Sequence, residues 1–285
     1  MGQLDAFKSE IKFSFSKLSK VKTKTNFFTN HRYDYYYMFQ KYGLNSQSFL
    51  EWILNKMQPT GRESVLDYSY FKHLLQDEEK LYFNSFKEVY VTSLAKNFIE
   101  TNLKLINCCS NVKMVLSNQL KLAVSANSFD YIYVNHRQSS LTNEQKNVLM
   151  REFLRILKSD GDLYVTTLAK EYYLSIYELF QEYDLEVLDL SFCNEAIVFD
   201  YLDNIFERVD LETYESKLWI TNADDLISYI LFDPELSYFS SLISTQGISK
   251  LRHSLNQRIE RDGGILIPYR VNVVKASHKI QLKLV

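Results

Sequence analysis

Glu63-Ser-Val-Leu-Asp67-Tyr-Ser-Tyr-Phe-Lys-His-Leu-Leu75 places a short apolar run directly before an aspartate and a turn. This pattern is typical of the first strand and first helix of an α/β domain, the place where such domains usually hold a ligand. A turn that grips a nucleotide needs glycine, because only a residue without Cβ lets the backbone approach the ligand closely. Here the turn consists of Tyr68, Ser69, Tyr70 and Phe71. The segment therefore predicts an α/β fold and argues against a glycine loop.

The composition is that of a globular chain, since 46% of the 285 residues are hydrophobic and 24% are charged. The formal net charge of −2 gives no global attraction to nucleic acid, so a nucleic-acid partner is not expected. No apolar run approaches the roughly 20 residues of a membrane helix, and no signal-peptide core is present. We therefore expect a cytoplasmic protein without membrane insertion.

The cysteines and glycines disfavour several classes of site. Cys108, Cys109 and Cys193 lack the spacing of a zinc site, so we expect reduced thiols, no structural disulfide and no metal. Seven glycines are few for this length. The sequence also contains no phosphate-binding P-loop, no nucleophile elbow and no His-Glu-x-x-His pair. Enzymes built on these motifs are excluded.

The first 60 residues are expected to form an N-terminal helical arm or lid, and residues 61–285 one α/β domain. Residues 5–20 place apolar side chains on one helical face and lysines elsewhere. This suits either a docking arm or a solvated helix that packs against the domain. The aromatic run at residues 33–39 either roofs a pocket or core, or stacks on bases.

After the first strand the pattern alternates between strands and helices. Strands are predicted at residues 88–92, 112–116, 129–134 and 162–166, and helices at residues 46–56 and 95–106. Thr142 and Gln145 form a capping box for a further helix that runs through Leu157, and Gly161 is expected to close it. This spacing predicts a parallel sheet with helices on both faces and a ligand crevice at the carboxyl ends of the strands.

The second half of the chain predicts strands at residues 187–191, 195–199 and 209–214, with a short helix that ends at 204–206. A helix is expected to start at Thr221 or Asn222, because Thr and Asn both cap well and Asp224 suits the first turn. Trp219 is either a partner-facing anchor or a core residue. Residues 265–267 and 271–274 predict a final, antiparallel edge of the sheet.

The order of these segments resembles class I S-adenosylmethionine-dependent methyltransferases of the small-molecule type. The similar segments are Val65-Leu-Asp67, Ser128-Phe-Asp130, Arg155-Ile-Leu-Lys-Ser-Asp-Gly-Asp-Leu163, residues 195–230 and Arg258-Ile-Glu-Arg-Asp-Gly-Gly-Ile265. The resemblance implies a Rossmann-like methyltransferase fold. Such a fold has a mostly parallel seven-stranded sheet with helices on both faces and an antiparallel edge strand, here with N-terminal helices added. Residues 196–262 would then form the substrate region.

The resemblance also implies which residues would meet S-adenosylmethionine. Asp67 ends the first strand, and Ser69 stands in the turn where the family has glycine. Ser93, or Thr92 if the register slips, replaces the carboxylate that binds the ribose, and Asn118 replaces the aspartate that receives the adenine amino group. A hydroxyl is a weaker acceptor than a carboxylate, whereas Asn keeps an acceptor oxygen. Asp67 either faces the ligand or ties the turn together through backbone N–H groups.

His136, after the fourth strand, is the catalytic candidate. It could take a proton from a substrate hydroxyl, or it is a polar residue of a rim loop. Two hypotheses follow. In the first, which the rings of Tyr68, Tyr70 and Phe71 in the crevice favour, the chain is a pseudoenzyme that no longer binds S-adenosylmethionine and instead binds a protein partner or another small-molecule ligand. In the second, it is a divergent methyltransferase that acts on a small molecule.

Overall fold

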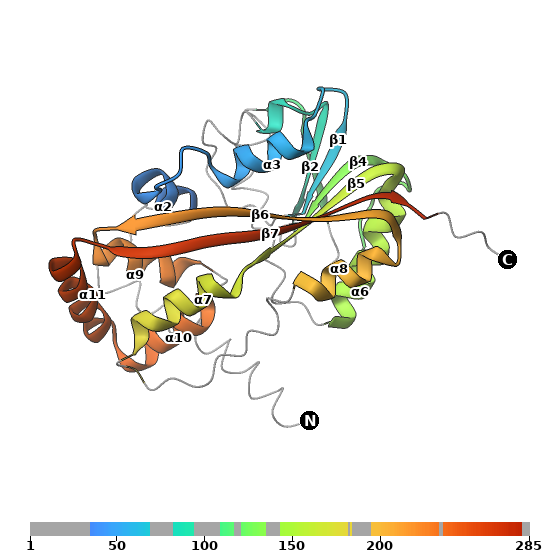
Figure 1. Cartoon of the computed structure of the whole chain (residues 1–285). Helices are drawn as coiled ribbons and strands as arrows, with labels where there is room; N and C mark the ends of the chain where they lie inside the picture. The colour runs from blue at the N-terminus through green and yellow to red at the C-terminus, as the bar shows by residue number, and fades with distance from the viewer. Residues whose placement is uncertain are drawn as a thin grey trace. The chain divides into compact units, whose positions relative to one another are not determined.

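The computed structural model describes residues 35–68, 82–93, 109–116, 121–134, 143–181, 183, 195–233 and 236–280. The described strands are β1 (Ser64–Tyr68), β2 (Glu88–Ser93), β3 (Val112–Leu116), β4 (Phe129–Val134), β5 (Leu157–Leu168), β6 (Phe206–Ile220) and β7 (Ile265–Lys279). They form a seven-stranded sheet in the order β3-β2-β1-β4-β5-β7-β6 (Figure 1). Strands β3, β2, β1, β4 and β5 pair in parallel, and β7 runs antiparallel to β5. The predicted Rossmann-like sheet is confirmed.

The described helices are α2 (Tyr35–Tyr42), α3 (Phe49–Met57), α6 (Asn143–Ile156), α7 (Lys170–Tyr177), the 3-10 helix η2 (Glu178–Phe180), α8 (Glu195–Asp203), α9 (Ala223–Phe232), α10 (Ser237–Gln246) and α11 (Ile248–Asp262). None of these described helices has the length and apolar character needed to cross a bilayer. The elements group into two compact units. The larger unit, residues 43–178, 185–219 and 266–285, holds nearly the whole sheet, and the smaller unit, residues 1–42, 179–184 and 220–265, holds α2 and α9 to α11. The predicted boundary at residue 60 stays a prediction.

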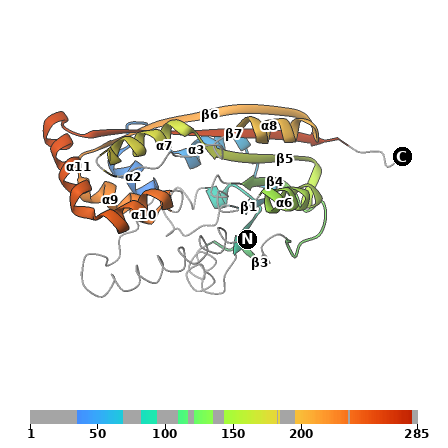
Figure 2. The ribbon, with the colours of Figure 1, turned by 90° about the horizontal axis from the view of Figure 1, so that it is seen from below.

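The main core of the larger unit lies between one face of the sheet and the helices α6 and α8 (Figures 1 and 2). Leu66 of β1 and Ile132 of β4 point to this side and are fully buried. Phe153 of α6 and Leu202 of α8 fill the space between sheet and helices. Because alternate residues of a strand face opposite sides, the other face needs its own cover.

Helix α3 provides part of that cover. It begins after Ser48, whose hydroxyl oxygen accepts a hydrogen bond from the Glu51 backbone N–H at 3.2 Å. The ring of Phe49 lies 5.3 Å from the ring of Tyr214 in β6. At the other end of the helix, the Met57 carbonyl accepts a hydrogen bond from a tyrosine hydroxyl of β4 at 3.1 Å. The predicted helix at residues 46–56 and the predicted cover of both faces are confirmed.

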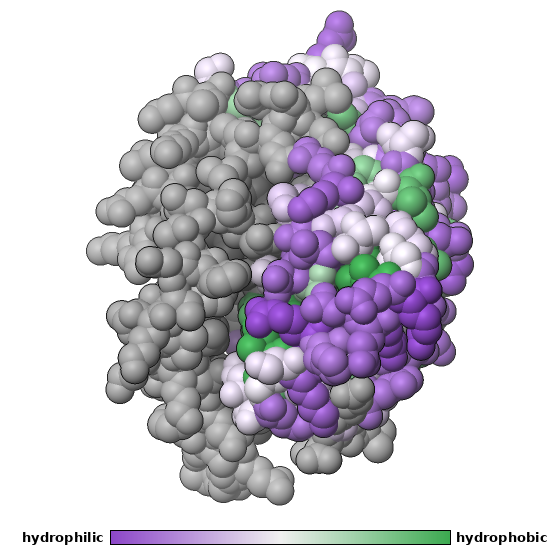
Figure 3. Space-filling view, turned by 90° about the vertical axis from the view of Figure 1, so that its left-hand side faces the viewer, coloured by the Kyte–Doolittle hydropathy of each residue, from purple (hydrophilic) through white to green (hydrophobic). Residues whose placement is uncertain are grey.

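In the smaller unit, α9 starts where the sequence predicts. The side-chain oxygen of Asn222 accepts a hydrogen bond from the Asp225 N–H at 3.0 Å, which caps the helix. The buried Asp225 carboxylate in turn accepts hydrogen bonds from the Tyr42 hydroxyl and the Lys41 ammonium group, both at 2.5 Å. These bonds tie α2 to α9. The described surface on the left-hand side of Figure 1 is mostly hydrophilic, with small hydrophobic areas (Figure 3).

Residues 195–199 belong to helix α8, so the predicted strand there is wrong. Leu202 is fully buried, and Val198, four residues earlier, is partly buried against the same core. Side chains four residues apart face one side of a helix, and a short apolar run cannot by itself be distinguished from a strand. The segments predicted at residues 5–20, 95–106 and 187–191 lie outside the described residues.

Gly161 lies inside β5, so the prediction that it closes a helix is wrong. Helix α6 continues directly into β5 at Leu157. Phe129 pairs with Leu157 and Tyr131 pairs with Asp162, which means that β5 bulges between these pairs. A Cβ on Gly161 would lie 2.8 Å from Leu157 Cδ1 and 2.9 Å from a carbonyl oxygen of β4. Glycine is therefore needed for the close approach of two strands.

The antiparallel end of the sheet is confirmed, and β6 rather than β7 is its outermost strand. β6 is 15 residues long and extends well beyond the predicted 209–214. Gly43 forms an antiparallel bridge with Leu218, and the Leu44 N–H donates to the Lys217 carbonyl at 2.9 Å. A short segment of the chain thus covers part of the outer edge of β6.

Candidate functional site

The candidate site lies at the carboxyl ends of the parallel strands in the larger unit. Asp67 of β1 is level with Val91 of β2 and Tyr133 of β4. Ser93, the last residue of β2, is level with the last residue of β3. Open α/β sheets bind their ligands at this edge. The register therefore brings the two predicted positions Asp67 and Ser93 to neighbouring strand ends.

Tyr68 does not face a crevice, which corrects the prediction that its ring fills one. The side chain is fully buried within the core beneath α6. Its ring packs edge-on against Phe153, with 5.1 Å between the ring centroids. The ring is therefore part of the core and does not extend beyond the strand end. Tyr70 and Phe71 lie outside the described residues.

Asp67 points to the opposite side of the sheet from Tyr68, because the two are consecutive in a strand. Asp67 is fully buried, and its strand neighbours Val91 and Tyr133 are buried as well. Protein atoms alone therefore enclose the carboxylate. Whether it orders the turn after β1 or meets a ligand stays a prediction.

Thr92 is the second of the two residues predicted at the ribose position. It is level with Val115 of β3, and both are buried on the α6 side of the sheet. Among the described residues, the Thr92 hydroxyl oxygen is a buried polar atom without a hydrogen-bond partner. Such a group costs about 1–3 kcal/mol of desolvation. The backbone of Ser93 is described, and its side chain is not. Ser69, Asn118 and His136 lie outside the described residues.

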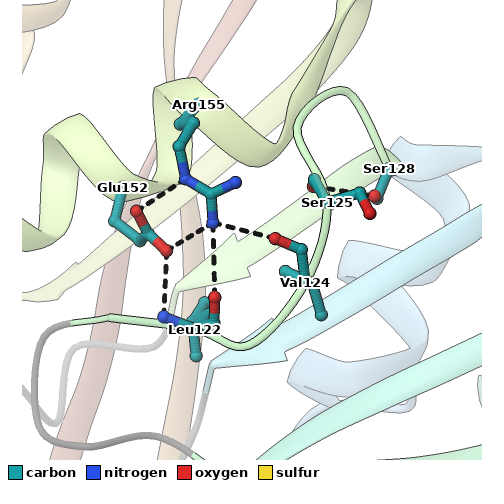
Figure 4. A network of polar contacts seen from close by, with 6 residues as sticks. All are labelled: Leu122, Val124, Ser125, Ser128, Glu152 and Arg155. Atoms are coloured by element: carbon teal, nitrogen blue, oxygen red, sulfur yellow. Dashed lines mark hydrogen bonds and ion pairs between the residues drawn. The ribbon is translucent and has the colours of Figure 1, made fainter.

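A Glu–Arg pair on α6 holds the segment that leads into β4 (Figure 4). The buried Glu152 carboxylate accepts hydrogen bonds from the Leu122 N–H and from Arg155 Nε, both at 2.9 Å. Arg155 Nη2 donates to the carbonyl oxygens of Leu122, at 3.3 Å, and Val124, at 3.0 Å. The pair thus fixes the backbone of the described residues Leu122 and Val124, which come soon after Asn118 in the sequence.

Electrostatics reinforce this anchor. The hydrogen bond from Arg155 lowers the pKa of the Glu152 carboxyl below its usual value, although burial acts in the opposite direction. The same bond raises the pKa of Arg155. Sequence reasoning missed the pair. The i, i+3 spacing of opposite charges on a predicted helix was the available signal, but it is also common on solvated helix faces.

Asp130, from the Ser128-Phe-Asp130 signature, has a structural role at the other end of the strands. Its carboxylate accepts a hydrogen bond from the Ser64 N–H at 2.8 Å and pairs with Lys158 Nζ at 2.6 Å. These contacts join the start of β1 to β4 and to the bulge of β5. Among the described residues, no group of three His, Cys, Asp or Glu side chains is placed to hold a metal ion.

The sequence profile of the ubiE/COQ5 methyltransferase family matches residues 50–218, from α3 to the far part of β6. The chain belongs to this family. A search among curated proteins finds no match. The assignment confirms the predicted resemblance to class I methyltransferases. All five predicted site residues of this ubiE/COQ5 family member lie within the matched range, namely Asp67, Ser69, Ser93, Asn118 and His136.

Chains with a similar fold are present among solved structures. YcgJ from Bacillus subtilis is 14% identical, with 81% of this chain and 98% of that chain covered and a TM-score of 0.52. Phosphoethanolamine N-methyltransferase 2 from Haemonchus contortus, in complex with S-adenosyl-L-methionine, is 13% identical, with 85% and 55% covered and a TM-score of 0.49. A SAM-dependent methyltransferase from Aquifex aeolicus is 18% identical, with 56% and 82% covered and a TM-score of 0.42. The similarity to YcgJ supports the fold alone.

Proposed function

We propose that this member of the ubiE/COQ5 methyltransferase family is a non-catalytic binding module that has lost its S-adenosylmethionine site. The observation that carries the proposal is the end of β2, which reads Val91-Thr-Ser93 and contains no carboxylate. An ionised carboxylate is the best acceptor for two ribose hydroxyls. The buried Thr92 hydroxyl faces the core beneath α6 and is no substitute for one.

The turn after β1 supports the same proposal. Ser69 and Phe71 stand where the family has glycine, and a side chain there prevents the close approach of the backbone to the methionine part of the cofactor. Each lost contact weakens binding, and about 1.4 kcal/mol corresponds to a tenfold change in affinity. Losing both the ribose carboxylate and the glycine turn is expected to weaken binding by orders of magnitude.

Calorimetric titration of the full chain with S-adenosylmethionine and with S-adenosylhomocysteine tests this proposal. We expect no binding heat for either compound at about 1 mM, a concentration at which even ligands worth only about 4 kcal/mol half-saturate a site. Circular dichroism of the same sample verifies that the protein is folded. Stoichiometric binding of either compound with a Kd in the micromolar range would show that the proposal is wrong.

The second candidate is a divergent methyltransferase that acts on a small molecule. The family match across the site and the retained Asp67 favour it. In this case the cofactor would contact Asp67, Ser69, Ser93 and Asn118, and it would supply an activated methyl group that needs positioning more than acid or base help. His136 could accept the proton of a substrate hydroxyl. Binding of S-adenosylmethionine in the titration would select this candidate.

A further inference from the structure

The pair of strands β6 and β7 forms a long ribbon in the larger unit, and one part of it carries exposed apolar side chains. The two strands are neighbours in the sheet and run side by side in both ribbon views (Figures 1 and 2). The Thr213 hydroxyl lies 3.0 Å from the side-chain oxygen of Asn272, and Arg270 pairs with Glu215. Numbers rise along β6 as they fall along β7, so these contacts fix an antiparallel register.

The same register continues toward the ends of the ribbon that connect to the smaller unit. It places Lys217 opposite Pro268, and Trp219 opposite Leu266. Leu44 joins this group from the outer edge, because its N–H donates to the Lys217 carbonyl at 2.9 Å. Leu44, Trp219 and Leu266 are 60%, 37% and 46% exposed. We call these five residues the ribbon patch.

The ribbon patch faces away from the core of the larger unit. Burial alternates along β6, so that Tyr214 and Leu218 are buried while Lys217 and Trp219 are exposed. The chain has two tryptophans. Trp52 of α3 packs against Tyr214 at 5.8 Å between ring centroids, whereas Trp219 lies on the open face. Tryptophan is enriched among the residues that contribute most to binding at protein interfaces.

Lys217 gives the ribbon patch a positive charge that no described carboxylate neutralises. No ion pair between described residues includes Lys217. The nearby Arg270, by contrast, pairs with Glu215 and lies 3.8 Å from Glu171. The carboxylate of Glu215, two residues before Lys217 on β6, is thus already paired with Arg270. The patch therefore favours a ligand that brings its own carboxylate.

A second copy of the chain fits the ribbon patch poorly. A two-fold axis would place two patches of the same positive charge face to face, so that neither copy supplies a carboxylate for Lys217 from the patch. Three exposed apolar side chains also supply far less than the roughly 800 Å² per partner of a standard interface. A single amphipathic helix needs fewer anchors, because such helices bind through side chains at i, i+3, i+4 and i+7.

We infer that the ribbon patch binds an amphipathic helix of a partner protein. Aliphatic side chains of that helix cover Trp219 and Leu266, and a carboxylate at the edge of its apolar stripe pairs with Lys217. This inference rests on the proposed binding module and names the class of its partner. The patch lies on β6 and β7, which β4 and β5 separate from β1 in the strand order of the sheet.

Amphipathic helical peptides of about four turns test the inference. They share one leucine stripe and carry Glu, Gln or Lys beside it. Trp52→Phe leaves Trp219 as the only tryptophan, so its fluorescence reports directly on the patch. We expect a blue shift on titration with the Glu peptide and a Kd about tenfold lower than for the Lys peptide. In the Lys217→Glu variant, the Lys peptide is expected to bind with a lower Kd than the Glu peptide.

The double variant Trp219→Ala, Leu266→Ala is expected to lose peptide binding in calorimetry. Leu211→Ala is the matched control, because Leu211 is a similarly exposed leucine of β6 outside the patch, and this variant should bind like the wild type. Circular dichroism checks the fold of each variant. Three outcomes would each overturn the inference. They are no binding of any peptide at about 1 mM, equal Kd values for the Glu, Gln and Lys peptides, or a dimer of the protein that Trp219→Ala dissociates. Binding of S-adenosylmethionine would overturn the proposed function and would leave these readouts unchanged.

Discussion

Glu152 and Arg155, less than one helical turn apart on α6, hold the backbone of Leu122 from both sides. The carboxylate accepts its N–H at 2.9 Å, and the guanidinium group donates to its carbonyl oxygen at 3.3 Å. The two charged groups also bond each other at 2.6 Å. Neither side chain can therefore be removed without leaving a buried polar group of the other, or of the backbone, unsatisfied.

Arg155→Ala is expected to lower the free energy of unfolding by about 1–3 kcal/mol, because the Val124 carbonyl loses its donor and the buried Glu152 carboxylate keeps only the Leu122 N–H. Urea denaturation measures this loss. Arg151→Ala is the matched control, since Arg151 is an exposed arginine of the same helix, and a change within about 0.5 kcal/mol is expected for it. Equal losses for the two variants would mean that the network adds nothing to stability.

Glu152→Gln is expected to make the free energy of unfolding less dependent on pH under acidic conditions. The hydrogen bond from Arg155 lowers the pKa of Glu152 in the folded protein. Because the pKa of Glu152 is lowered by folding, its carboxylate stabilises the folded protein at pH values above its pKa in the unfolded chain, about 4.3. This stabilisation is lost as the pH falls through the pKa of Glu152 in the folded protein. Urea midpoints between about pH 6 and pH 3 should therefore fall less steeply for the variant than for the wild type. Parallel curves would contradict the role of this carboxylate.

Gly161→Ala is expected to destabilise the protein by more than about 2 kcal/mol, because the new Cβ overlaps the backbone of β4 and cannot be relieved by a rotamer change. Gly61→Ala is the informative control. Gly61 has a φ of +82° and nothing within 4 Å of its Cβ position, so only the backbone conformation opposes alanine, at about 1–2 kcal/mol. Thermal unfolding of both variants gives the comparison. A smaller loss of stability for Gly161→Ala than for Gly61→Ala would show that the backbone of β4 can shift at little cost in free energy.

Tyr131→Phe is expected to reduce the loss of stability at high pH. Burial raises the pKa of Tyr131 to about 12, and the neighbouring Glu63 carboxylate adds to the shift. Because the pKa of Tyr131 is raised by folding, the stabilisation by its neutral hydroxyl is complete below the pKa of tyrosine in the unfolded chain, about 10. It is lost as the pH rises toward the pKa of Tyr131 in the folded protein. The variant should also lose about 1 kcal/mol at neutral pH, because the hydrogen bond to the Met57 carbonyl is gone. Urea midpoints between about pH 7 and pH 11 measure both effects.

Restoring the missing features at the strand ends should create binding of S-adenosylmethionine. The combined variant Ser69→Gly, Phe71→Gly, Ser93→Asp returns two glycines to the turn after β1 and a carboxylate to the end of β2. We expect at least a tenfold gain in affinity over the wild type, since a charged acceptor is worth about 1.5–3 kcal/mol. Ser93→Asn is the control with the same shape and no charge. No gain in the combined variant would place the cause of the loss elsewhere.

Sequence patterns predict the strands well where apolar runs are short and clearly bounded. The predicted limits of β3 and β4 match the structure, and the capping role of Asn222 is confirmed. The apolar run at residues 195–199 resembles a strand because its helical face becomes visible only when Leu202 is included. Gly161 resembles a helix stop in sequence, and only the pairing of β4 with β5 reveals the crowding that requires it.

The positions of Asp67 and Tyr68 in the first strand were predictable, but the orientation of their side chains was not. The sequence places Asp67 and Tyr68 at the end of the first strand, but it does not tell which of them faces α6. The register between β1 and β4 settles this, and it directs Tyr68 onto Phe153. The ribbon patch could not be predicted as a whole, because Leu44 and Leu266 come from distant parts of the chain. From the sequence, only Trp219 was considered, as either an interface anchor or a core residue.

β6 ends at Ile220 and β7 begins at Ile265, and the two strands are adjacent in the sheet. Everything between them is therefore one enlarged hairpin connection, and it starts and finishes at nearly the same point. Its helices could be exchanged, lengthened or replaced by a tight turn without any change in strand order. The strand order of the sheet therefore does not depend on the length of this connection.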